Sequence, residues 1–339
     1  MDPTRAGTEV ALAKKPSRIY ALDFTKGALV LIMVLYHWLN YFVTSNGTVY
    51  KYLRFLTPSF IFISGFLISH VYLSKYRTSG LKVPRRLLVR GFKLLAIVFC
   101  LNMALSLLRL QAVETRVSSL SRGNMVSAYL VGTASVSFWI LVPIAYLLIL
   151  SAGLLIVSRH YRNIFLAVCA LFVACALLFE WEGIRSGYLQ ILGIGMLGIS
   201  VGYIPIERIN GILKRRLAIL LAYSAYLLAI TLWNDPYPLQ IVGVCLSLAI
   251  IYWMGMGDPD GNIRKGVILL GQYSLFAYIA QIVILQMLRR GLRPLGSGIG
   301  ASCAAFLACA ACTILSVEVL DRARIKMSGV NKLYTAVFC

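Results

Sequence analysis

Long apolar stretches separated by short polar segments run along nearly the whole of this chain of 339 residues. A helix that crosses a membrane needs about 20 predominantly apolar residues, within a range of about 17 to 25. The pattern therefore predicts an all-α fold, a polytopic transmembrane bundle of about ten membrane-spanning helices. The ten stretches occupy residues 20–43, 53–74, 91–109, 138–158, 163–181, 187–204, 217–233, 239–255, 267–288 and 298–320.

The composition agrees with a membrane protein and changes how the charge is interpreted. Apolar residues make up 60% and charged residues 13% of the chain, and the mean hydropathy is +0.81, outside the usual range of soluble domains. The net charge of +21 could suggest a nucleic-acid partner. However, most of the 33 Lys and Arg residues fall on one side of the bilayer if the N-terminus is cytoplasmic. The positive-inside rule then predicts two cytoplasmic termini and the lipid bilayer, not nucleic acid, as the partner.

One basic segment departs from this rule, since Arg289, Arg290 and Arg293 would lie on the outer side. Either this loop binds an anionic group, or a span near it is misplaced. The domain layout follows from the spans: residues 1–17 form a disordered cytoplasmic tail, 18–325 the transmembrane domain and 326–339 a second cytoplasmic tail. The first apolar stretch is too long and too charged for a cleavable signal peptide, so we expect a retained signal anchor.

The first apolar stretch carries three ionisable residues, Asp23, Lys26 and His37. Ionisable groups at membrane depth are costly and usually face a bundle interior or a wet cavity, which makes them candidates for function. In a helix that begins near Tyr20, His37 lies about 25 Å across the membrane, toward the outer half. Asp23 lies about 21 Å from His37 along the same axis and is expected to pair with Lys26 at i, i+3. The alternative is a structural ion pair together with a hydrogen-bonded core histidine.

Two short motifs are expected to be structural. Gly193, Gly195 and Gly198 spell GxGxxG, but no strand precedes them, so close helix packing is favoured over nucleotide binding. Cys309 and Cys312 form a CxxC without a second pair of ligands, and the three histidines are far apart in sequence. We therefore predict neither a redox centre nor a metal site.

Five segments, in order along the chain, resemble the membrane enzymes of acyltransferase family 3. RIYALDFTKGALVLIMVLYH is similar to the N-terminal signature of that family, with Lys26 where arginine is usual. PSFIFISGFLIS, RRLLVR, SFWILVPIAYLL and LGQYSLFAYIAQ resemble its later segments, although Gln281 stands where a histidine is common and Leu275 replaces an aromatic residue. The N-terminal matches are Arg18, Leu22, Asp23, Gly27 and His37.

The resemblance implies transfer of an acyl group, most readily acetyl, from acyl-CoA to a hydroxyl of a carbohydrate, glycolipid or other cell-surface precursor. It also implies a place in the bacterial inner membrane and no tightly bound cofactor. His37 would act as general base or as transient acyl carrier, with Asp23 as a second catalytic candidate. A positioned base that removes the proton from a hydroxyl raises the reaction rate by about a hundred- to ten-thousand-fold. Histidine suits that task because its unperturbed pKa lies near the working pH.

Basic residues near the cytoplasmic side are candidates for binding the phosphates of acyl-CoA, because arginine forms charge-assisted bonds with phosphate. They also serve topology and contact with anionic lipids, which is the structural alternative. The donor-binding candidates are Arg86, Arg90, Lys26 and Arg18, with Lys82, Arg85 and Lys93 in the same basic cluster. The acceptor-binding candidates, several of which could simply be interfacial aromatic residues, are Tyr36, Asn40, Tyr41, Trp139, Tyr278 and Glu180.

Two other functions stay open. RGFKLL and GYLQILG are similar to segments of heparan-glucosaminide N-acetyltransferase-like enzymes, which implies transfer to an amino sugar. A transporter or flippase for a surface-polymer precursor would use the intramembrane charges as a substrate pathway. The sequence shows no inverted repeat and no pair of interrupted helices, and this counts against a transporter.

Overall fold

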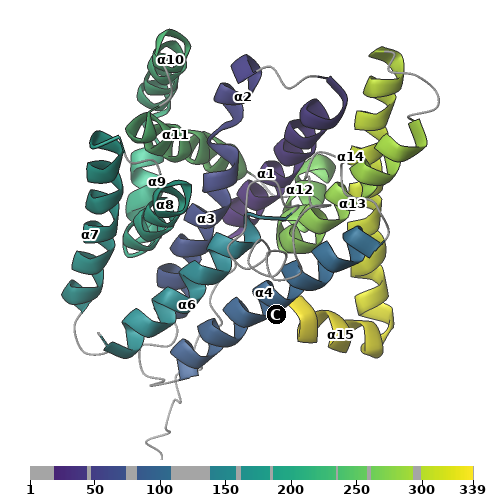
Figure 1. Ribbon diagram of the computed structural model, residues 1–339, viewed down its shortest axis with the longest axis horizontal. Coiled ribbons are helices and arrows are strands. Elements are labelled where there is room, and N and C mark those ends of the chain that lie inside the picture. The colour runs from purple at the N-terminus through teal and green to yellow at the C-terminus, as the bar shows by residue number, and fades with distance from the viewer. Residues whose placement is uncertain are drawn as a thin grey trace, which may run out of the picture.

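The computed structural model describes residues 19–43, 47–73, 82–107, 138–157, 162–183, 186–233, 236–257, 261–292 and 299–338, all of them helix or short turn. The predicted tail over residues 1–17, and Arg18, lie outside the described residues. Figure 1 shows the helical bundle, with α7 and α10 at one side, α1 near the middle and α14 and α15 at the other side. The helices are α1 (Tyr20–Trp38), η1 (Leu39–Val43), α2 (Gly47–Leu53), α3 (Leu56–Leu67), η2 (Ile68–Leu73), α4 (Lys82–Leu107), α6 (Leu141–Val157), α7 (Arg162–Trp181), α8 (Gly187–Val201), α9 (Ile206–Leu213), α10 (Arg216–Leu232), α11 (Tyr237–Gly255), α12 (Asn262–Gln272), α13 (Ser274–Leu292), α14 (Ile299–Lys326) and α15 (Ser328–Phe338).

The all-helical prediction is confirmed for the described residues, and the helices are those of a polytopic membrane protein. Every predicted apolar stretch overlaps a helix. Among the described residues, six helices are long and apolar enough to cross a membrane, or up to eight if each bent pair is one span. Two further apolar helices, α6 and α10, are shorter. The count of ten spans and the side on which the termini lie remain predictions.

Two of the helix pairs are sharply bent, which corrects the expectation that the chain has no pair of interrupted helices. α8 and α9 meet at 103°, and α12 and α13 meet at 92°. Pro205 precedes α9 and cannot continue the helix before it. Tyr273 lies between α12 and α13 with non-helical dihedrals (φ −106°, ψ 25°), so the predicted span 267–288 is not one continuous helix.

Glycines allow two helix crossings to be very close. A Cβ at Gly27 on α1 would overlap the Val267 carbonyl oxygen on α12, and one at Gly271 would overlap the Asp23 carbonyl oxygen. At the α3–α8 crossing, a Cβ at Gly198 would overlap the carbonyl oxygen of Phe62. Such contacts are typical of helix packing through small residues. The structural interpretation of the GxGxxG motif is therefore confirmed.

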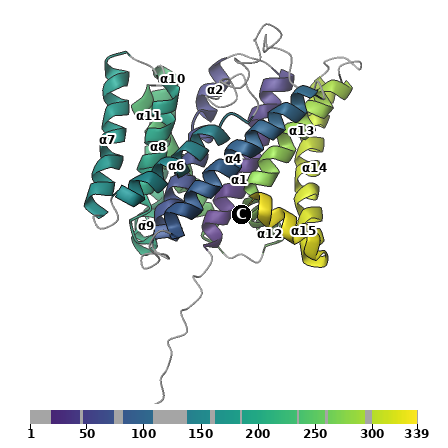
Figure 2. The same ribbon diagram turned by 60° about the horizontal axis from the view of Figure 1, so that its bottom comes forward.

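The segment after α14 folds back onto the bundle. α14 runs to Lys326, and α15 begins two residues later at Ser328. Tyr334 on α15 is buried, and its ring lies edge-on to Tyr273 with 5.4 Å between the centroids. Figure 2 shows α15 lying across the end of α14, beside α12 and α4. Most of the segment predicted as a C-terminal tail is thus an ordered helix packed on the core.

Candidate functional site

His37 lies in the last turn of α1, immediately before the π-helical turn η1. Its ring is surrounded by three tyrosines, with centroid distances of 5.4 Å to Tyr36, 6.0 Å to Tyr41 and 6.4 Å to Tyr278. Tyr41 belongs to η1 and stacks on the imidazole, while Tyr278 comes from α13. Single π-helical turns are frequent at functional sites, where they change the direction of a side chain. The structure therefore brings together four of the sequence-predicted site residues.

The Nε2 atom of His37 is buried and has no hydrogen-bond partner among the described residues. A buried polar atom without a partner costs about 1–3 kcal/mol. The structural alternative was that His37 is a core histidine held by hydrogen bonds. Within the described part of the chain, Nε2 forms no such bond. It is free to bond a molecule that is not part of the protein.

Further polar groups of α13 lie near this cluster. The guanidinium carbon of Arg289 lies 5.6 Å from the Tyr41 ring centroid, and no carboxylate of the described residues forms an ion pair with Arg289. Gln281, one turn beyond Tyr278, is fully buried, and neither its amide nitrogen nor its amide oxygen has a partner in the described ranges. Aromatic rings thus pack around His37, and several buried polar atoms of α1 and α13 have no hydrogen-bond partner among the described residues.

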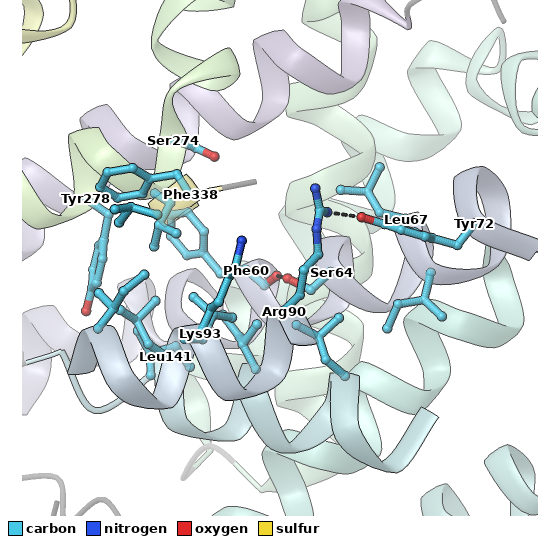
Figure 3. Close-up of a pocket in the computed structure, with 18 residues that line it drawn as sticks. Phe60, Ser64, Leu67, Tyr72, Arg90, Lys93, Leu141, Ser274, Tyr278 and Phe338 are labelled. Atoms are coloured by element: carbon cyan, nitrogen blue, oxygen red, sulfur yellow. Dashed lines mark hydrogen bonds between the residues drawn. The ribbon is translucent and has the colours of Figure 1, made fainter. Parts of the chain in front are cut away.

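A cavity of about 220 Å³ lies on the other side of Tyr278 (Figure 3). It is enclosed by side chains from α3, η2, α4, α6, α13 and α15. Arg90 and Lys93 on α4 supply positive charge to its wall, and Arg90 donates a hydrogen bond to the Tyr72 hydroxyl. His37 does not line the cavity. The Tyr278 ring lines the cavity and contacts the imidazole, so one aromatic ring separates the two.

One protein-family model matches most of this chain. Residues 19–319 match the family model of acyltransferase family 3, described as an acyltransferase domain. The chain belongs to this acyltransferase family. No curated protein and no solved structure gives a significant match. The matched region includes His37 and the cavity walls from α3, η2, α4, α6 and α13, and it ends before α15.

In this acyltransferase, Asp23 and Lys26 lie near the start of α1, whereas His37 lies at its end. The Lys26 ammonium is 2.7 Å from a carboxylate oxygen of Asp23, which confirms the predicted i, i+3 ion pair. Asp23 is buried where α1 crosses α12, and its carbonyl oxygen faces Gly271. The pair therefore lies at the crossing of α1 with α12, and it is not in contact with the imidazole.

Of the other predicted site residues of the acyltransferase that the structure describes, one lines the cavity and the rest lie outside it. Arg90 lines the cavity, whereas Arg86 on the same helix is exposed and does not. Trp139 is half-buried at the start of α6, and Asn40 is exposed in η1. Glu180 accepts a hydrogen bond of 2.6 Å from Gln190 on α8, away from the tyrosines around His37.

Sequence reasoning missed two aromatic residues that shape the site. Phe138 is buried with a positive φ of 64°, which is rare for a bulky residue. Its ring lies edge-on to Tyr278, 6.1 Å between centroids. Phe338 on α15 lines the cavity. Nothing in the local pattern marks either residue, although Phe138 precedes the Trp of the family-like segment SFWILVPIAYLL.

Proposed function

We propose that this acyltransferase transfers an acyl group, in the first instance acetyl, from acyl-CoA to a hydroxyl of a carbohydrate, glycolipid or other cell-surface precursor. The observation that carries the proposal is the buried Nε2 of His37, unpartnered within the described residues and one tyrosine ring away from a cavity with a basic wall. A general base needs such an atom, because it must bond the proton that it removes.

Charge supports the donor side of this proposal. Arg90 and Lys93 lie in the cavity wall, and phosphate groups are bound by such cations. The positive-inside rule predicts that this end of α4 lies in the cytoplasm, where acyl-CoA is made. Arg86, exposed one turn earlier, could contact further phosphates of the nucleotide part. The thioester would then enter toward Tyr278.

The reaction step follows from these positions. The hydroxyl of the acceptor gives its proton to Nε2 of His37 while its oxygen attacks the thioester carbonyl carbon. The carbon–sulfur bond then breaks, the ester forms, and the proton passes from the imidazolium to the leaving thiolate. The same buried nitrogen would also serve a transient acyl-imidazole, in which it attacks the thioester first. Tyr36 and Tyr41 offer aromatic faces for the ring of the acceptor.

Two alternatives share parts of this site. The bent helix pairs α8–α9 and α12–α13 are of a kind found in transporters, so a carrier for a surface-polymer precursor of the bacterial inner membrane is the second candidate. Membership of the acyltransferase family favours the enzyme over the carrier. Transfer to the amine of an amino sugar would use the same base, and only the acceptor atom would differ.

The test is thiol release from labelled acetyl-CoA by the purified protein in lipid nanodiscs, with candidate sugars supplied. His37→Ala should lower the rate of thiol release by at least a hundredfold. His70 stacks on Phe66, and His70→Ala, the control, should retain most of the wild-type rate. Thermal unfolding of both variants checks that they remain folded. Full activity of His37→Ala would remove His37 from the mechanism, and uptake of a precursor without thiol release would favour the carrier.

A further inference from the structure

α15 closes one end of the cavity, although it lies outside the part of the chain that matches the family. Val337 and Phe338 line the cavity together with Ser274 and Tyr278 of α13. In Figure 3, Phe338 lies next to Tyr278 and Ser274, whereas Arg90 and its tyrosine partner lie at the other end. The cavity thus has a basic end and an aromatic end, and α15 contributes to the aromatic end.

The position of α15 is fixed by specific contacts. Arg324 on α14 donates hydrogen bonds of 3.1 and 2.8 Å to the Asn331 side chain, and its guanidinium lies 4.1 Å from the centroid of Tyr334. Tyr334 in turn stacks on Phe338, with 4.9 Å between the ring centroids. Phe338 also meets the ring of Phe276 on α13 at 6.2 Å. These contacts hold the Phe338 ring in the cavity wall.

The volume of the cavity limits what can occupy it. An apolar protein cavity of about 150 Å³ accommodates benzene, which corresponds to about 25 Å³ for each non-hydrogen atom. At that ratio, a cavity of about 220 Å³ holds about nine such atoms. An acetyl group with the sulfur and the adjoining ethylamine of the coenzyme arm has about seven, and the hexanoyl equivalent has about eleven. The first fits within this volume, and the second extends beyond it.

We propose that Phe338 is a specificity-determining residue that restricts the donor to short acyl groups, because its ring fills the end of the cavity beside Tyr278. This inference rests on the proposed function, in which the cavity takes the thioester end of acyl-CoA. Removal of the ring extends the aromatic end of the cavity toward α15, and a longer acyl chain then has room next to Tyr278. A larger ring at the same position leaves less room even for acetyl.

The experiment compares acetyl-CoA with hexanoyl-CoA, using thiol release for kcat/KM and thermal stabilisation in nanodiscs for binding. For the wild type, kcat/KM should be at least tenfold higher with acetyl-CoA than with hexanoyl-CoA, and the Kd obtained from the thermal stabilisation at least tenfold lower. Phe338→Ala should raise the hexanoyl-to-acetyl ratio by at least tenfold, and Phe338→Trp should weaken the use of both donors. Leu333→Ala is the matched control, because Leu333 lies on the same helix but is 67% exposed, and its ratio should equal that of the wild type.

The outcomes separate this inference from the proposed function. Equal binding or use of the two donors by the wild type, or an unchanged ratio in Phe338→Ala, overturns the role of Phe338 and leaves acyl transfer intact. Selective binding of acetyl-CoA that depends on Phe338, without thiol release in any condition, supports the cavity assignment and contradicts the catalytic proposal. If neither donor stabilises the protein, both are overturned.

Discussion

Replacement of Arg324 by alanine should release α15 from the bundle while the rest of the fold stays in place. Arg324 is the cation between α14 and α15: it bonds Asn331, lies over the Tyr334 ring and donates a 3.0 Å hydrogen bond to the Tyr273 hydroxyl. Tyr273 in turn donates to Asp321 at 2.6 Å. Among these contacts of Arg324, those with Asn331 and Tyr334 join α14 directly to α15.

The magnitude follows from those two contacts. The bifurcated hydrogen bond to Asn331 contributes about 1–1.5 kcal/mol, and the cation–π contact with Tyr334 contributes about 0.5–1 kcal/mol near the surface. Their loss lowers the free energy that holds α15 against the bundle by about 2 kcal/mol, which corresponds to about thirtyfold in the equilibrium between docked and released α15.

Hydrogen exchange measured by mass spectrometry is the assay, because it reports local opening separately from global unfolding. Amides of residues 328–338 should exchange about thirtyfold faster in Arg324→Ala, and amides of α3 should not change. Arg322→Ala is the matched control. Arg322 lies on the same helix and forms an exposed ion pair with Glu318 at 3.3 Å, and such pairs contribute little.

Unchanged exchange in α15, or an equal increase in Arg324→Ala and Arg322→Ala, would refute this account of how α15 is held. Since α15 carries Phe338, its release should also relax donor selectivity in the same direction as Phe338→Ala. A variant with a released α15 and wild-type selectivity would separate the two effects.

Two further predictions concern packing and donor binding. Gly198→Ala should lower the unfolding free energy by at least about 2 kcal/mol in thermal denaturation, because the new Cβ overlaps a backbone carbonyl of α3; Gly153→Ala, where a Cβ meets nothing within 4 Å, should be neutral or stabilising. Lys93→Ala should raise the KM for acetyl-CoA about tenfold or more through loss of a charge in the cavity wall, whereas Lys214→Ala, exposed at the end of α9 and outside the basic cluster, should leave it unchanged.

Much of the fold could be predicted from the sequence, because apolar length and small-residue spacing are local signals. The helical class, the ion pair between Asp23 and Lys26 and the close packing at Gly198 were all predicted. The two bent helix pairs were not, since hydropathy reports how apolar a segment is and not whether its axis turns. At Tyr273 the break coincides with side-chain bonds to residues about 50 positions later in the chain.

The candidate site was predicted in part, for a similar reason. Tyr36 and Tyr41 flank His37 at helical spacing, so their proximity follows from one helix, and the family resemblance pointed to Tyr278. Lys93 was predicted only as one member of a basic cluster, and Phe338 was not predicted, because both line the cavity through contacts between distant helices. The segment that contains Phe338 was predicted as a cytoplasmic tail, because it is too short to span a membrane; its packing against the bundle depends on contacts with α13 and α14. The proposed roles of all these residues remain predictions.

The most direct test of the central claim is an experimental structure of the protein with acetyl-CoA bound. The account predicts the thioester carbonyl beside Tyr278, within reach of His37 Nε2, and the coenzyme phosphates beyond the basic end of the cavity, toward Arg90 and the exposed Arg86. A coenzyme bound elsewhere, or a thioester that the Tyr278 ring still separates from His37 Nε2 in the bound structure, would contradict it.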